Sequence, residues 1–121
     1  MAHNDRRDEN ENEIREAFRA AGWFWQPCDR YQGHDANVYG SGMCFAVEVK
    51  NGYHPPSHRT LTPLEKQFKR TIELRGVRLW ILLSVDDALA LISGNYEAIP
   101  ELPEYATLPI EDSDNDAVRL P

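Results

Sequence analysis

The sequence lacks any apolar stretch that approaches the length of a bilayer-spanning helix, and it contains only two cysteines, Cys28 and Cys44. The first absence argues against a membrane protein. Two cysteines fit free thiols in a reducing compartment better than a disulfide framework. The first residues are polar and charged and do not have the pattern of a signal peptide, so we expect a cytoplasmic protein. No internal repeat is visible, and 121 residues predict one folded domain.

Basic residues are outnumbered, with 13 Lys and Arg against 20 Asp and Glu, and the net charge is −7. The charges are unevenly distributed. Residues 97–121 carry seven acids and one base, whereas residues 50–78 carry seven bases and two acids, together with His54 and His58. A local basic patch can bind phosphates even when the whole chain is acidic. The alternative interpretation of this window is a solvated helix face.

Helical and strand patterns alternate along the chain and predict a small α/β domain over residues 1–94. The expected elements are a helix over 8–21, a strand over 23–25, a two-stranded hairpin over 35–39 and 43–50, a helix from 62, a strand over 78–83 and a helix over 85–92. The first three strands are predicted to form an antiparallel meander. The fourth is expected to join in parallel through a helical crossover. Residues 95–121 are expected to form an acidic, proline-rich tail that is extended or poorly ordered.

Local signals mark the two later helices. Thr62 and Glu65 predict a capping box, with Pro63 in the first turn. The expected buried stripe of this helix consists of Leu64, Phe68 and Ile72. The pair Ser84 and Asp87 predicts a second capping box at the start of the last helix.

Glu48 and Lys50 close an apolar run over residues 43–50 that predicts a buried strand. Because they are two residues apart, they lie on the same face of that strand. A charged pair in a buried strand is costly unless something compensates for it, and a divalent cation with a second carboxylate would do so. Asp35 supplies that carboxylate if its strand pairs with this one across the glycine-rich turn. The sequence therefore predicts a metal site made of Asp35 and Glu48, with Lys50 beside it.

Several stretches together form a pattern more specific than an acid-x-Lys motif alone. They are Arg7-Asp8-Glu9-Asn10 leading to Glu13-Ile14, Gly33-His34-Asp35, Val47-Glu48-Val49-Lys50-Asn51-Gly52, Pro55-Pro56-Ser57-His58-Arg59-Thr60-Leu61-Thr62-Pro63 and Ser84-Val85-Asp86-Asp87-Ala88-Leu89. With its order of elements, the chain resembles the PD-(D/E)xK nuclease superfamily, and within it the small stand-alone VRR-NUC-type nucleases of phages and bacteria. The resemblance covers residues 7–92. It implies a restriction-endonuclease-like α-β-β-β-α-β-α core, a mixed four-stranded sheet flanked by helices.

The resemblance implies a metal-dependent endonuclease that hydrolyses DNA phosphodiester bonds. Asp35 and Glu48, helped by the Val49 carbonyl, would bind Mg²⁺ or Mn²⁺, whose preference for hard oxygen ligands fits carboxylates. Lys50 would position or activate the attacking water and stabilise the developing charge. Glu13 falls where these nucleases often place a helix carboxylate at the edge of the metal site. Glu9, one helical turn earlier, is a competing candidate.

The second helix and the loop before it are expected to hold the DNA backbone, through His54, His58, Arg59, Lys66, Lys69 and Arg70. Relatives often act on branched DNA, so Holliday junctions are a natural substrate and a two-fold homodimer with two active sites is a natural assembly. The resemblance also implies a location in the cytoplasm of a bacterium or a phage-infected host cell. The sequence itself shows neither dimerisation nor branch preference.

The chain departs from the family pattern at three positions. His34 stands where many relatives have Pro, and Asn37 interrupts the apolar residues that usually follow the first acid. Glu65 stands where many relatives have Gln, a residue often near the active site, and Gln67 lies two residues further on. Glu65 is expected to act mainly in the capping box.

Other interpretations stay open. Asp35 could cap its own turn. A zinc site could combine His54 and His58 with Cys28 and Cys44, although their spacing matches no usual zinc pattern. As a different class of function, the chain could be a non-catalytic nucleic-acid-binding or protein-interaction module with a nuclease-like fold. Its acidic tail would then occupy a basic groove or bind a basic partner.

Overall fold

The computed structural model describes residues 2–29 and 32–106, with side chains from Asn10 onward. The α-helices are α1 (Ala2–Ala20), α2 (Pro63–Glu73) and α3 (Val85–Ser93); the strands are β1 (Phe24–Pro27), β2 (Ala36–Gly40), β3 (Met43–Val49) and β4 (Leu79–Leu82); and short 3₁₀ turns are η1 (Pro56–His58), η2 (Tyr96–Ala98) and η3 (Pro103–Tyr105). The predicted order of helices and strands is confirmed, although α1 begins earlier and β1 lies slightly later than expected. None of the described helices combines the length and apolarity needed to cross a membrane.

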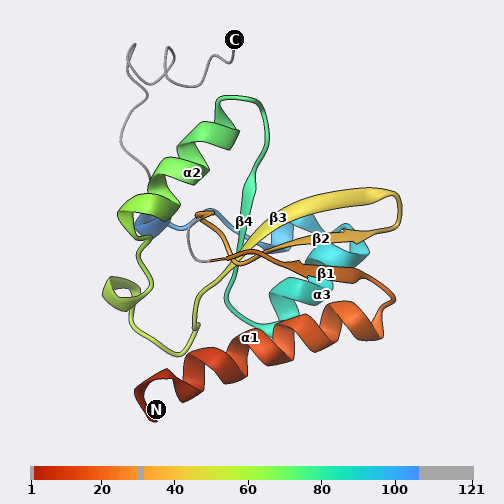
Figure 1. The fold of residues 1–121 in the computed structure, drawn as a ribbon, viewed down its shortest axis with the longest axis horizontal. Coiled ribbons are helices and arrows are strands. Elements are labelled where there is room, and N and C mark those ends of the chain that lie inside the picture. Colours follow the sequence, from red (N-terminus) through yellow and green to blue (C-terminus); the bar gives the residue numbers. More distant parts are fainter. Residues whose placement is uncertain (1, 30–31, 107–121) are drawn as a thin grey trace.

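The four strands form one mixed sheet in the order β1-β2-β3-β4 (Figure 1). The pairs β1–β2 and β2–β3 are antiparallel, and β4 pairs with β3 in parallel after the crossover through α2. The β2–β3 hairpin turns at Ser41 and Gly42, which both have positive φ, at 51° and 76°. This backbone matches the twist of a hairpin and explains the Gly-Ser-Gly sequence. The predicted mixed α/β architecture is therefore confirmed.

Apolar side chains form two clusters on opposite faces of the sheet, because successive strand residues point to opposite sides. The larger cluster joins the sheet to α1 and α3, with Phe18, Trp25, Val47, Leu82 and Leu91 among its members. The smaller joins the other face to α2 and to the segment after α3, through Leu61, Leu79, Ile81 and Tyr105, with Phe68 packed against them. Figure 1 shows α1 and α3 on one side of the sheet and α2 on the other. Glu48, between Val47 and Val49 of the larger cluster, therefore faces α2.

The caps of α2 and α3 differ. In α2 the predicted capping box is present: the Thr62 side chain accepts from the Glu65 N–H at 3.2 Å, and Glu65 Oε1 accepts from the Thr62 N–H at 2.8 Å. In α3 only half of the box forms, because the Asp87 carboxylate accepts from the N–H of Leu83 instead of that of Ser84. The predicted second capping box is therefore wrong in one of its two hydrogen bonds. The Asp87 carboxylate bonds to the end of β4 instead of to the cap residue.

The buried face of α2 also differs from the predicted stripe. Phe68 and Ile72 pack on the sheet as expected, but Leu64 is 40% exposed and Lys69 is only 4% exposed. The carboxylates of Glu73 and Glu101 approach the Lys69 ammonium at 2.6 and 3.5 Å. A lysine can be buried when it is paired in this way. The expected place of Leu64 in the stripe is therefore wrong.

Residues 95–106 pack against the domain. Ile99 and Tyr105 are almost fully buried, each in one of the two apolar clusters. The expectation of an extended tail directly after Gly94 is wrong for these twelve residues, because these two large side chains anchor them. The remainder of the predicted tail, residues 107–121, lies outside the described residues.

Candidate active site

Asp35 lies beside the end of β3 because of the register of the β2–β3 hairpin. Ala36 pairs with Val47, and the Asp35 N–H donates to the Val47 carbonyl at 3.1 Å. The Asp35 carboxylate then accepts from the Val49 N–H at 2.7 Å. This bond spans two strands, so the interpretation of Asp35 as a cap of its own turn is not needed to explain its position. Val49 contributes its amide to the site, and the metal-binding role of its carbonyl stays a prediction.

Glu48 is the most unusual residue of the site. Its side chain is 1% exposed, and among the described residues neither carboxylate oxygen has a hydrogen-bond partner. Burial is the main cause, and together with the nearby carboxylates of Asp35 and Glu65 it raises the pKa of Glu48 to about 10, against the opposing effect of Lys50. Glu48 is therefore protonated at neutral pH unless positive charge is brought to it.

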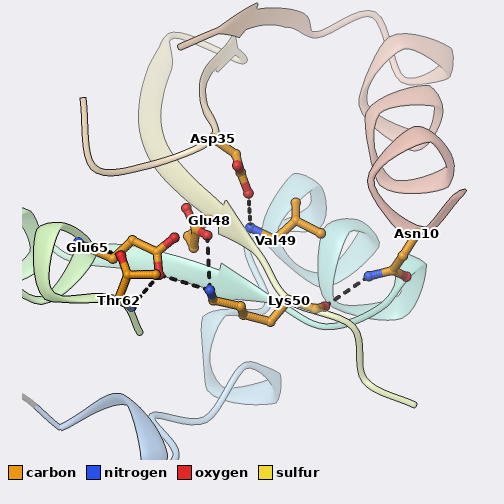
Figure 2. A network of polar contacts seen from close by, with 7 residues as sticks. All are labelled: Asn10, Asp35, Glu48, Val49, Lys50, Thr62 and Glu65. Carbon is orange, nitrogen blue, oxygen red and sulfur yellow. Dashed lines mark hydrogen bonds and ion pairs between the residues drawn. The ribbon is translucent and has the colours of Figure 1, made fainter. Parts of the chain in front are cut away.

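Lys50 lies between two carboxylates (Figure 2). Its ammonium is 2.9 Å from Glu65 Oε1 and 3.5 Å from Glu48 Oε2. Burial acts to raise the pKa of Glu65, but the Glu48 carboxyl and the hydrogen bonds from Lys50 and the Thr62 amide outweigh it and lower the pKa. Glu65 is therefore ionised and is the principal counter-ion of Lys50. The capping role of Glu65 is confirmed, and the same carboxylate also belongs to the site.

Asp35, Glu48 and Glu65 line one cavity of about 220 Å³. Its other lining residues are Gly33, His34, Thr62 and Leu64. Carboxylate oxygens are the donors that Mg²⁺ and Mn²⁺ prefer, and the two oxygens of buried Glu48, which lack hydrogen bonds to the described residues, fit a cation. In residues 2–29 and 32–106, however, no group of three or more His, Cys, Asp or Glu side chains is gathered closely enough to hold a metal ion. A cation at Asp35 and Glu48 would therefore need water or substrate oxygens as further ligands, which is the usual habit of Mg²⁺.

The helix residue that contacts the site is Asn10, not Glu13. The Asn10 side chain is buried and donates to the Lys50 carbonyl at 2.9 Å. Glu13 is exposed and lines a separate cavity of about 550 Å³ with Arg59 and Tyr105, so its predicted place at the metal site is wrong. The helical phase explains the error: Asn10 is four residues before buried Ile14 and shares its face, whereas Glu13 does not. The four-residue spacing between Asn10 and the apolar Ile14 is the sequence pattern that could have identified Asn10 as the inward-facing residue.

The predicted DNA-holding residues divide into two groups. Lys69 is buried and paired with acids, and Arg59 is half-buried with its guanidinium 3.0 Å from Glu104, so neither presents an open cation. Their placement on a free basic surface is therefore wrong. Lys66 and His58 are exposed, and Arg70 and His54 are partly exposed. The basic charge of residues 50–78 is thus partly neutralised within the fold.

The remaining candidates are Gln67, Glu9 and the four residues of the alternative zinc site. Gln67 is exposed on α2 and does not line the cavity of about 220 Å³, and the side chain of Glu9 lies outside the described residues. Cys28 and Cys44 are free thiols. Cys28 contacts His34 at 3.4 Å, whereas the rings of His54 and His58 lie near each other, 6.4 Å apart between centroids. In the described part of the chain, the four residues of the alternative zinc site are not gathered into a group that could hold a metal ion.

Comparison with family models, curated proteins and solved structures gives no significant match to this chain.

Proposed function

We propose that this protein is a metal-dependent endonuclease with a PD-(D/E)xK-type core, which hydrolyses phosphodiester bonds in DNA. One observation carries the proposal: Glu48 is a buried carboxylate with no hydrogen-bond partner among the described residues, placed beside Asp35 and Lys50 at the end of β3. A buried carboxyl group without hydrogen bonds destabilises a fold, and groups of this kind are concentrated at functional sites. Binding a divalent cation would give this carboxylate its missing partner.

Each residue of the site has a distinct role in this proposal. Asp35 and Glu48 would hold the cation. Lys50 would place its ammonium next to the scissile phosphate, where it stabilises the charge that develops in the transition state. Glu65 keeps the Lys50 side chain in place, and Asn10 fixes the Lys50 backbone from α1. A bound cation would lower the pKa of an attacking water and neutralise phosphate charge.

A cleavage assay with linear, flapped and four-way DNA in the presence of Mg²⁺ or Mn²⁺ tests the proposal. We expect cleavage by the wild type that chelation of the metal abolishes, and none by Glu48→Gln, which keeps the shape of the side chain but removes its charge. If Glu48→Gln cleaves as fast as the wild type, the proposed mechanism is wrong. Comparing the three substrates also decides whether branched DNA is preferred, and sedimentation of the protein with a four-way junction tests for a homodimer.

A second candidate function is a nucleic-acid-binding or protein-interaction module without catalysis. It is favoured by the acids after α3: Glu104 pairs with Arg59, and Glu101 pairs with both Lys69 and Arg78. These carboxylates form ion pairs with basic side chains, as the phosphates of a nucleic acid or the acids of a partner protein would. Calorimetric titration with Mn²⁺ separates the two functions, because only the nuclease requires metal uptake. DNA binding without uptake of Mn²⁺ would favour the module.

A further inference from the structure

A second cavity, of about 550 Å³, lies beside the candidate active site at the carboxyl end of β4. Ile81 lines it and pairs with Glu48 across the parallel β3–β4 ladder, so both side chains are on the sheet face that α2 covers. The Asn10 side chain, which donates to the Lys50 carbonyl, also lines it. In α/β sheets, ligands commonly bind at the carboxyl ends of parallel strands. The cavity is therefore a neighbour of any substrate that Lys50 holds.

The loop after Lys50 forms one wall of this cavity. Gly52 lines it and donates from its N–H to the Leu83 carbonyl at 3.2 Å, and a Cβ at this position would lie 2.9 Å from that oxygen. Tyr53 also lines it, and the Tyr53 N–H donates to the Asn51 side chain at 2.9 Å. The Tyr53 side chain is nevertheless 87% exposed. A backbone fixed by hydrogen bonds thus holds an open aromatic ring at the edge of the cavity.

The rest of the lining combines apolar and polar side chains. Its apolar members are Ile81, Leu83, Val85, Ile99, Pro100 and Leu102. Arg59 and Tyr105 add polar groups, and neither Arg59 Nε nor the Tyr105 hydroxyl makes a hydrogen bond with any described residue. A cavity of this size and composition is typical of a site for a small ligand that is apolar over most of its surface.

The charge of the lining argues against a phosphate as the ligand of this cavity. The acids that line it are Glu13, Asp86 and Asp87. Arg59 also lines it, but its guanidinium is already 3.0 Å from the Glu104 carboxylate. A phosphate would be repelled by this surplus of negative charge, whereas an uncharged heterocycle with polar atoms on its edge would not. Nucleobases have these properties, and aromatic side chains bind them by stacking, with little dependence on sequence.

We propose that this cavity receives one unpaired nucleobase of the DNA substrate, stacked on Tyr53, while the adjoining phosphate lies at Lys50. The inference rests on the proposed function, because it names the form of DNA that the same site accepts. A base inside a duplex must leave its stack and its partner to enter a cavity, whereas a base in a single-stranded flap is already unpaired. The enzyme is therefore expected to select DNA with unpaired nucleotides next to the cleaved bond.

Fluorescence anisotropy with flapped DNA tests the inference on the full chain, at low salt and with a chelator that prevents cleavage. The probes carry an abasic spacer at each unpaired position in turn. We expect the spacer to weaken binding to the wild type about 10-fold at one position near the junction and to have little effect elsewhere. Tyr53→Ala should bind the intact flap about 10-fold more weakly and should no longer respond to the spacer.

Two variants serve as controls. Tyr53→Phe keeps the ring and should bind every probe as the wild type does. Phe24→Ala removes another exposed aromatic side chain, which does not line the cavity, and should retain the sensitive position. Equal binding of all probes by the wild type would overturn the base pocket, and metal-dependent cleavage by the same protein would show that the nuclease function stands without it. A sensitive position that persists in Tyr53→Ala would show that the base binds elsewhere and would also overturn the pocket.

Discussion

Lys50 and Lys69 are two buried lysines, each paired with two glutamates, yet their surroundings differ. The partners of Lys69 are partly open to solvent, with 32% of the Glu73 side chain and 45% of the Glu101 side chain exposed. The partners of Lys50 are Glu65, at 12%, and Glu48, at 1%. Solvent can therefore stabilise the acids around Lys69, whereas Glu48 depends on what enters its cavity. A buried lysine does not by itself indicate a functional site. The solvent exposure of its carboxylate partners is the more informative property.

The largest effect that separates the two lysines is expected in catalysis. Lys50→Ala removes the ammonium that we propose lies next to the scissile phosphate, and it should lower the DNA cleavage rate about 10²- to 10³-fold, the usual effect of losing one transition-state contact. Lys69→Met, the matched variant in the second pair, should cleave within a few-fold of the wild type. Single-turnover cleavage with Mn²⁺ measures both rates. Equal losses of cleavage rate in the two variants would show that the difference between the surroundings of Lys50 and Lys69 has no role in catalysis.

The dependence of stability on pH is expected to be the next largest difference. Burial and the nearby carboxylates raise the pKa of Glu48 to about 10, above its ordinary value in the unfolded chain. Between these two pKa values the folded state binds a proton that the unfolded state does not bind. Stability without metal should therefore be highest in acid and decline as the pH rises toward 10, by up to about 1.4 kcal/mol per pH unit from this residue.

Urea denaturation with a chelator present, between pH 5 and pH 9, measures this slope. The comparison is with Glu48→Gln, in which the contribution of residue 48 is absent, and with Glu73→Gln, which should retain the wild-type slope. Saturating Mn²⁺ should flatten the wild-type curve, because the cation takes the place of the proton. Wild-type and Glu48→Gln curves that run parallel would contradict the assigned state of Glu48.

A smaller effect is expected on folding stability from the second pair. Lys69→Met leaves Glu73 and Glu101 without their buried cation, but both acids can turn toward water. The loss should be about 1–2 kcal/mol, between the values for exposed and for buried pairs. Thermal and urea unfolding measure it, and adding Glu73→Gln to Lys69→Met should restore part of the loss. A cost of 4 kcal/mol or more would mean that this pair is as isolated from solvent as the first.

The sequence predicted those features that depend on neighbours along the chain. Strand alternation placed Glu48 and Lys50 on one face, the glycine-rich turn brought Asp35 to them, and the spacing of Thr62 and Glu65 gave the α2 cap. The features that it missed depend on partners distant in sequence. Burial of Lys69 requires Glu101, and a composition rich in proline and acid concealed the anchors that hold residues 95–106. The metal site, the DNA substrate and the superfamily stay predictions, because no observed contact tests them.

The smallest expected effect concerns the acids that cover the basic residues. Glu104→Gln should release the Arg59 guanidinium from its 3.0 Å pair and strengthen DNA binding about two- to fivefold at low salt, with the gain disappearing at high salt. Glu97→Gln removes the same charge from an exposed position in η2 and is the matched control. Point substitutions are preferable to truncation at Gly94, which would remove Ile99 and Tyr105 from the core. Fluorescence anisotropy of labelled DNA across a salt series measures both variants. Equal gains in both would show that total charge, and not release of Arg59, governs binding, and the acids after α3 would then have no specific part in covering the basic residues.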